Sequence, residues 1–190
     1  MVLPMSWAKE FADFDCSAKE MADRLTMTGS KVECYTNAAD AVENVVIGRI
    51  ESIVPHPDSD HMVICQVEAG QGAPLQIVTG AANLKVGDLV PVALDGSTLP
   101  GGVKINKGVL RGVESNGMLC SLAELGLTVH DFPYAIEDGI LVLDARDYPE
   151  GMPAPGTPAV KALGMDDVVF EFEITPNRPG CLAVRELGRE

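Results

Sequence analysis

Short runs of alternating apolar and polar residues occupy the middle of the chain. They cover residues 45–54, 62–68, 75–78 and 89–94, and glycine, proline, aspartate and asparagine separate them. Several short strands with turn residues at this spacing indicate a small barrel or sandwich rather than alternating strands and helices. A further apolar run at residues 139–143 could supply a closing strand. The pattern therefore predicts a small β barrel in the middle of the chain.

Each end of the chain combines helical and strand patterns. Ser17 and Glu20 form a Ser-x-x-Glu capping box, and the helix that follows is expected to end at Gly29, with a strand at residues 31–35. Residues 168–174 alternate between large apolar residues and a second set that includes two glutamates, which is typical of a strand with one wet face. Neither end has enough apolar surface to fold alone.

We therefore predict a mainly β chain with α+β flanks. Residues 1–40 and 151–190 are expected to pack together as one small split α+β domain, and residues 41–150 form an OB-fold barrel inserted between them. A proline-rich linker is expected at residues 148–158, followed by a short helix with Thr157 as its N-cap.

Three segments carry a resemblance to known proteins. Residues 46–121, which end in the dense stretch LRGVESNGMLCS, resemble the tRNA-binding module of several aminoacyl-tRNA synthetases and their accessory proteins. The motifs LPMSW at residues 3–7 and ITPNRP at residues 174–179 resemble the two outer signatures of bacterial phenylalanyl-tRNA synthetase β subunits. The resemblance covers essentially the whole chain.

This resemblance implies an N-terminal fragment of a β subunit that works with an α subunit in an (αβ)₂ heterotetramer. It also implies that the whole enzyme uses ATP and Mg²⁺ to attach phenylalanine to tRNA(Phe). The α subunit would supply the catalytic site, and later β domains would supply editing and anticodon contact. No catalytic residue, metal ligand or cofactor is therefore expected within residues 1–190, and the helical pattern at the end of the chain favours a fragment of a longer protein.

The charge pattern limits how tightly the chain is expected to bind nucleic acid. A net charge of −14 is unlike the basic footprint of most nucleic-acid binders. Residues 96–113, however, contain no Asp or Glu and carry three cations, Lys104, Lys107 and Arg111. Because salt screens exposed charges beyond about 8–10 Å, such a strip can meet phosphate on an acidic protein. We expect weak tRNA binding through this edge.

The candidate RNA-contacting residues surround this strip. They are Arg49, Lys104, Lys107, Arg111, Ser115 and Asn116. The cations would neutralise phosphate, while the hydroxyl and amide could hydrogen-bond phosphate, ribose or a base. Arg49 would join the others only if its strand face is the same. The alternative is that the cations form the solvated outer face of an amphipathic hairpin.

Two loop motifs have both a structural and a functional interpretation. PHPDSDH at residues 55–61 is a proline-stiffened hairpin connection or an RNA-facing loop. The resembling family usually has Lys-Leu where this chain has His61-Met62, which removes one cation. TGAAN at residues 79–83 resembles the family's Gly-Ala-x-Asn turn, which structural need explains equally well.

Other chemistries find little support. The five cysteines lie far apart without a CxxC pair, which predicts reduced and mostly buried thiols and no zinc site. Cys120 is expected to be a core residue, and no motif of a hydrolase, metalloprotease or nucleotide-binding loop occurs. No apolar run reaches the roughly 20 residues of a membrane span, and the start lacks signal-peptide features. We expect a cytoplasmic protein with neither membrane nor DNA as a partner.

Two alternatives stay open. The module could have lost RNA binding and serve only in subunit interaction, which the net charge of −14 and His61 favour. A free-standing tRNA-binding protein would instead require the natural chain to stop near residue 190. The roles of Arg178 and Arg185 are open between ion pairing and domain docking.

Overall fold

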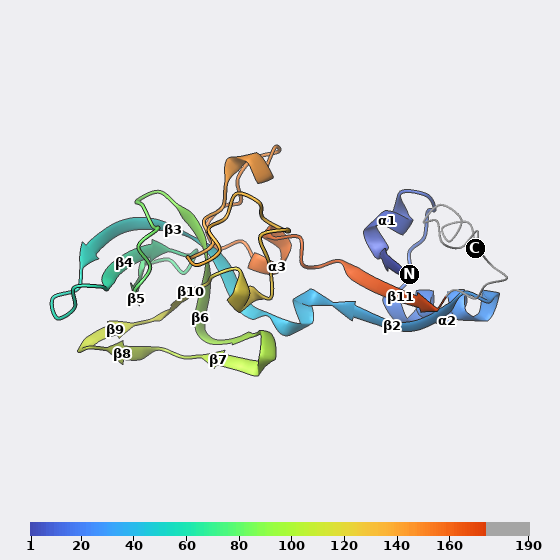
Figure 1. Cartoon of the computed structure of the whole chain (residues 1–190), viewed down its shortest axis with the longest axis horizontal. Coiled ribbons are helices and arrows are strands. Elements are labelled where there is room, and N and C mark those ends of the chain that lie inside the picture. The colour runs from blue at the N-terminus through green and yellow to red at the C-terminus, as the bar shows by residue number, and fades with distance from the viewer. Residues whose placement is uncertain (174–190) are drawn as a thin grey trace. The chain divides into compact units, whose positions relative to one another are not determined.

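The computed structural model describes residues 1–173, which fold as two compact units (Figure 1). One unit joins Met1–Ala39 to the segment that begins at Met165, and the other is formed by Asp40–Gly164. The ITPNRP motif, the helix expected near Cys181, and the two arginines of open role lie outside the described residues.

The first unit, formed by the two ends of the described chain, is a small sheet with two helices. Its elements are β1 (Val2–Pro4), α1 (Met5–Lys9), α2 (Ala18–Thr28), β2 (Lys31–Asn37) and β11 (Val168–Glu173). The strands pair antiparallel in the order β1-β11-β2, so β11 lies between two strands from the start of the chain. The N-terminal strand β1 was not predicted, because three residues are too few for a visible period.

Local signals in the first unit fold as predicted. The Ser17 hydroxyl accepts from the Glu20 N–H at 3.3 Å, and the Glu20 carboxylate accepts from the Ser17 N–H at 2.9 Å, which confirms the capping box. Gly29 ends α2 with φ of 105°, a backbone conformation that favours glycine. On β11, Phe170 and Phe172 are buried and the intervening Glu171 is exposed, as the alternation predicts.

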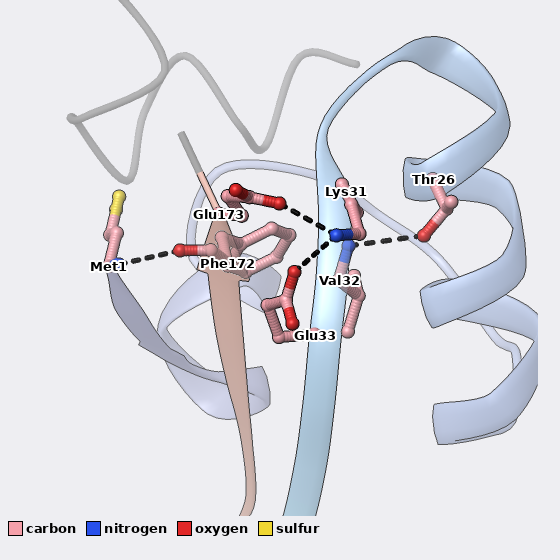
Figure 2. A network of polar contacts seen from close by, with 7 residues as sticks. All are labelled: Met1, Thr26, Lys31, Val32, Glu33, Phe172 and Glu173. Atoms are coloured by element: carbon pink, nitrogen blue, oxygen red, sulfur yellow. Dashed lines mark hydrogen bonds and ion pairs between the residues drawn. The ribbon is translucent and has the colours of Figure 1, made fainter. Parts of the chain in front are cut away.

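Polar contacts join the three strands of this unit at one end (Figure 2). The Met1 N–H and carbonyl exchange hydrogen bonds of 2.8 and 2.7 Å with Phe172. The Lys31 ammonium lies 2.7 Å from the Glu173 carboxylate and also pairs with Glu33. The hydrogen bond from Lys31 lowers the pKa of Glu173. Because these groups are exposed, we expect the pair to orient the strand ends more than to stabilise the fold.

The second unit is an antiparallel barrel of the OB type. Its strands are β3 (Glu43–Pro55), β4 (Val63–Glu68), β5 (Leu75–Thr79), β6 (Leu89–Leu99), β7 (Val103–Ile105), β8 (Gly108–Leu110), β9 (Val113–Ser115) and β10 (Gly117–Leu119). The sheet order is β10-β6-β3-β4-β5, with β7 paired to β6 and β8 paired to β9. The apolar side chains that alternate along these strands form one core, which includes Ile50, Val67, Ile77, Val92 and Leu119.

The barrel closes where the turn after β9 meets β5. The Asn116 N–H donates to the Gln76 carbonyl at 2.8 Å, and the Val78 N–H donates to the Ser115 hydroxyl at 3.0 Å. Residues 139–143, which could have supplied a closing strand, form no strand in the structure. They form an extended segment held by an isolated bridge from Ser121 to Ile140, because β9 and β10 already occupy the edge beside β5 and β6.

The segment before the last strand belongs to the barrel unit rather than to the first unit. The Ile47 N–H donates to the Thr157 carbonyl at 2.8 Å, and the Gly156 N–H donates back to the Ile47 carbonyl at 2.7 Å. Residues 151–164 therefore fall outside the split α+β domain to which they were assigned. The short helix α3 (Ala159–Ala162) has Pro158 as its N-cap, so the prediction of a Thr157 cap is wrong.

Short 3-10 helices and exposed loops make up much of the remainder. The 3-10 helices cover Ala38–Ala41, Pro100–Gly102, Ala123–Leu125 and Ala145–Asp147. Within residues 1–173, no helix is long and apolar enough to cross a membrane. The expectation of mostly buried thiols holds for Cys65 and Cys120, whereas Cys16 is half-buried and Cys34 is exposed.

Candidate nucleic-acid interface

The loop between β3 and β4 is fastened to the β8–β9 hairpin by one buried histidine. The His56 ring is 3% exposed. Its Nδ1 accepts from the Asp58 N–H at 3.0 Å, so Nε2 carries the proton and donates to the Leu110 carbonyl at 3.1 Å. The Arg111 guanidinium also donates to the Asp58 carbonyl at 3.3 Å. These bonds hold the hairpin tip and the loop together at one end of the barrel.

The hairpin tip itself is a two-residue turn. Leu110 pairs with Val113, and the intervening Arg111 and Gly112 have φ of 47° and 84°. Positive φ at both central residues is the geometry of a type I′ turn, whose twist matches that of the flanking strands. The turn places Arg111 at the exposed tip, beside the loop that begins at His56.

Three of the predicted cations lie on the arm formed by β7, β8 and β9. Lys104 is exposed on β7 opposite Thr98, and Lys107 is exposed between β7 and β8. The Lys107 ammonium lies 3.9 Å from the Asp95 carboxylate, which offsets part of its charge. Within residues 1–173, Lys104 and Arg111 have no carboxylate within 4 Å, so their charges stay open to an anionic ligand.

Arg49 lies apart from this arm. It is exposed on β3, where it pairs with Leu89 at the start of β6 and with Glu68 of β4. Lys104 pairs with Thr98 near the other end of β6. These two partners are about nine residues apart, which corresponds to roughly 30 Å of extended strand. The structure therefore does not bring Arg49 together with the arm.

Ser115 is a structural residue rather than a surface donor. It is 5% exposed, and its hydroxyl accepts from the Val78 N–H at 3.0 Å while donating to the Gly117 carbonyl at 2.9 Å. The hydroxyl thus donates and accepts within the barrel, where the turn after β9 meets β5. The expectation that it contacts RNA is therefore corrected. The neighbouring Asn116 is half-buried, and its side-chain amide has no hydrogen bond within the described part of the chain.

Comparison with known proteins identifies the family to which the barrel belongs. The family model described as "Putative tRNA binding domain" (tRNA_bind) matches residues 45–144, more than half of the chain and nearly all of the barrel. The chain belongs to this tRNA-binding domain family.

Similar curated proteins extend the likeness beyond the barrel. The chain is 50% identical over all 190 residues to a protein of Clostridium acetobutylicum named phenylalanine--tRNA ligase beta subunit, and 46% identical to a protein of the same name in Clostridium tetani. It spans 23% of the length of each. Among solved structures, the C-terminal domain of Plasmodium vivax p43 aligns over 40% of this chain and 44% of its own, with 23% identity and a TM-score of 0.33, too distant to support an argument.

The tRNA-binding domain also exposes apolar side chains between its cations. Val103, Val109 and Leu110 are 53%, 64% and 42% exposed on the same arm. Their alternation with polar residues is typical of a hairpin with one buried face, so the exposure of these three apolar side chains was not predictable from the sequence. Exposed aliphatic groups beside cations suit contact with ribose and base faces, which are less polar than phosphate.

The His56 bridge can be tested by mutation. Replacing His56 with alanine removes an acceptor for the Asp58 N–H and a donor for the Leu110 carbonyl. We expect a loss of about 1–3 kcal/mol in the free energy of unfolding of the barrel, together with faster amide exchange at Asp58. Urea titration and hydrogen exchange measure these effects. The matched variant His130→Ala removes an exposed histidine and should change stability by less than about 0.5 kcal/mol. Equal effects for the two variants would contradict the bridge.

Cys120 of the tRNA-binding domain is a core residue, as the sequence predicts. Cys120 is fully buried, and burial raises the pKa of its thiol to about 12, so the thiolate is not populated near neutral pH. Within residues 1–173 there is also no group of three His, Cys, Asp or Glu side chains placed to hold a metal ion.

Proposed function

We propose that this chain is the tRNA-contacting and scaffold region of a phenylalanine–tRNA ligase β subunit. The domain family of residues 45–144 and the full-chain similarity to proteins of that name support the proposal. The whole enzyme would act in the cytoplasm as an (αβ)₂ heterotetramer, using ATP and Mg²⁺ to attach phenylalanine to tRNA(Phe). The α subunit would carry the catalytic site, so this region would bind tRNA without reacting with it.

The observation that carries the proposal is the arm of β7, β8 and β9. Three cations lie there in an acidic chain, and Lys104 and Arg111 are free of carboxylate partners among the described residues. Phosphates of a tRNA backbone would meet these cations, while the exposed aliphatic groups would touch sugars and base faces. Asn116 would supply a hydrogen-bonding amide at the base of the arm.

The remaining charge keeps this contact weak. The chain carries a net charge of −14, so a polyanion is repelled by most of its surface. Binding through two or three phosphates on such a surface is expected to depend steeply on salt. In the whole enzyme the contact would add to those of other domains, as one of several linked sites.

A double substitution on the arm tests the proposal. We expect Lys104→Ala with Lys107→Ala to weaken tRNA binding roughly tenfold at about 50 mM salt, and to reduce the slope of log K against log salt by about 1 to 2. The slope is expected to fall by less than the loss of two phosphate contacts would give, because Asp95 already offsets part of the charge of Lys107. Fluorescence titration with tRNA(Phe) at several salt concentrations measures both quantities.

A charge-matched control separates the arm from the net charge. Lys85 and Lys161 are exposed lysines of the same unit that lie outside the arm. Lys85→Ala with Lys161→Ala should leave most of the affinity and the salt slope in place. Equal losses in the two double variants would remove the arm as the binding site.

A structural role is the second candidate, and the charge of −14 favours it. On that reading the first unit and the barrel act in subunit interaction, and RNA binding has been lost. The split α+β arrangement of the chain ends would then be the functional part. Absence of any tRNA binding by the unaltered chain at about 50 mM salt would leave this candidate alone.

A further inference from the structure

An open pocket of about 610 Å³ lies beside the β3–β4 loop, on the side of the β5–β6 turn. Its lining includes His56, Ser59, Asp60 and His61 from the β3–β4 loop, and Gly80 and Ala82 from the turn after β5. Its size falls within the range of roughly 300–1,000 Å³ that small organic ligands occupy in proteins. The pocket is separate from the cations of the arm, none of which lines it.

Internal hydrogen bonds fix the loop that forms one wall. The His56 N–H donates to the Met62 carbonyl at 3.0 Å and closes the loop at its base. The Ser59 N–H donates to the His56 carbonyl at 3.4 Å, and the His61 N–H donates to the Ser59 hydroxyl at 3.4 Å. The shape of this wall is therefore set before any ligand arrives.

The opposite wall is a turn of small residues that is also fixed. The Ala81 N–H donates to the Thr79 hydroxyl at 3.2 Å. Asn83, which follows the turn, donates its amide to the Ile140 carbonyl at 2.8 Å and accepts from the Ile140 N–H at 3.2 Å. Gly80 and Ala82 are exposed and short, so a flat ligand could approach the backbone of this turn closely.

The polar groups of the pocket suit a base better than a phosphate. Asp60 is exposed, and its carboxylate has no hydrogen bond to the described residues, so it can accept from an amino group of a ligand. The same negative charge, with Asp58 close by in the loop, repels phosphate. His61 is an exposed aromatic ring on which a base could stack.

We propose that this pocket receives one unpaired nucleobase that carries an exocyclic amino group. The proposal rests on the proposed function, since a base would be presented there as part of bound tRNA. His56 connects the pocket to the arm, because it lines the pocket and its ring donates to the Leu110 carbonyl of β8. An RNA strand whose phosphates lie at Arg111 could thus place a base in the pocket.

Free nucleosides test the pocket without involving phosphate. Cytidine and uridine differ in the base at C4, where cytosine carries an amino donor and uracil a carbonyl acceptor, and at N3. We expect cytidine, at concentrations around 1 mM and above, to shift the NMR signals of the amides at residues 59–61 and 80–82. Uridine should bind about five- to tenfold more weakly, since the carbonyl oxygen at its C4 cannot donate to the Asp60 carboxylate.

Matched variants assign the effect to named groups. Asp60→Ala should abolish the preference for cytidine, whereas Glu51→Ala, which removes an exposed carboxylate outside the pocket, should retain it. Ala82→Leu should block both nucleosides, and Ala73→Leu, on the turn at the far end of the β4–β5 hairpin, should block neither.

The outcomes separate this pocket from the tRNA-binding arm. Amide shifts with cytidine that disappear in Asp60→Ala support the pocket. Saturating shifts of equal size with both nucleosides, or no shifts at these amides, overturn it, even if tRNA still binds in a salt-dependent manner through Lys104 and Lys107. Absence of tRNA binding by the unaltered chain would overturn the proposed role of the arm, whereas the nucleoside result would stand.

Discussion

Replacing Gly117 with alanine is expected to destabilise the barrel by about 3 kcal/mol or more. Gly117 has φ of 150°, and a Cβ built there would lie 2.4 Å from the carbonyl oxygen of Ala93. That oxygen belongs to the backbone of β6, which pairs with β10 in register at this point. It cannot retreat without breaking the ladder, so the variant combines backbone strain with overpacking.

A second glycine separates these two costs. Gly101 has φ of 81°, and a Cβ there would meet nothing within 4 Å. Gly101→Ala should therefore show only the strain, about 1 kcal/mol. Urea titrations that follow amide signals of the barrel core measure both losses. Similar losses for the two variants would show that the contact with Ala93 is not what selects glycine at position 117.

The seam beside Gly117 also supports the arm. The Ser115 hydroxyl donates to the Gly117 carbonyl, and the Asn116 N–H donates to β5. If alanine displaces this turn, the hairpin that ends at Ser115 loses its fixed base. We therefore expect Gly117→Ala to weaken tRNA binding at temperatures where the barrel is still folded.

Local sequence patterns were enough to predict most elements of the fold. The short alternating runs located β3, β4, β5, β6 and β11. Burial alternates along β4 and β11, whereas residues 90–94 of β6 are all buried. The capping box and Gly29 defined α2 because these signals act within a few residues.

Features that depend on distant partners were not predictable in the same way. Residues 139–143 are as apolar as a strand, yet their edge of the barrel is taken by β9 and β10. Ser115 resembles a surface donor in sequence, and only the approach of Val78 shows that its hydroxyl is used internally. The separation of Arg49 from the arm likewise depends on strand register, which a single sequence does not contain.

The pocket beside His61 shows the same limit. The two loops that line it are far apart in the chain and were each interpretable as structural turns. Their side-by-side placement follows from the pairing of Val63 with Thr79, which brings the ends of β4 and β5 together. Chemistry that arises between two ordinary turns has no signature in either of them.

The second large effect is expected from Phe170→Ala in the first unit. Phe170 is fully buried on the central strand, opposite Leu3 on one side and Tyr35 on the other. Its ring centroid lies 5.8 Å from that of Tyr35 and 6.4 Å from that of Phe172. Truncation leaves a cavity and removes both ring contacts, at a cost of about 3–5 kcal/mol.

Such a loss is large for a unit with so small a core. The buried cluster of the first unit contains few side chains besides Phe170. A core of this size gives only a small free energy of unfolding. We expect this unit to be largely unfolded in Phe170→Ala at 25 °C. Trp7, the single tryptophan of the chain, lies in α1 and reports the transition by fluorescence. Phe11→Ala, which removes a phenylalanine that is 49% exposed in the same unit, should cost less than about 1 kcal/mol.

The same variant locates the tRNA contact. The described side chains that pack around Phe170 belong to the first unit, and the buried cluster around Ile50 belongs to the barrel. If the arm binds tRNA, Phe170→Ala should lose the Trp7 transition while it retains barrel amide protection and salt-dependent binding. Loss of tRNA binding with an intact barrel would instead assign the contact to the first unit, because only that unit would have lost its packing.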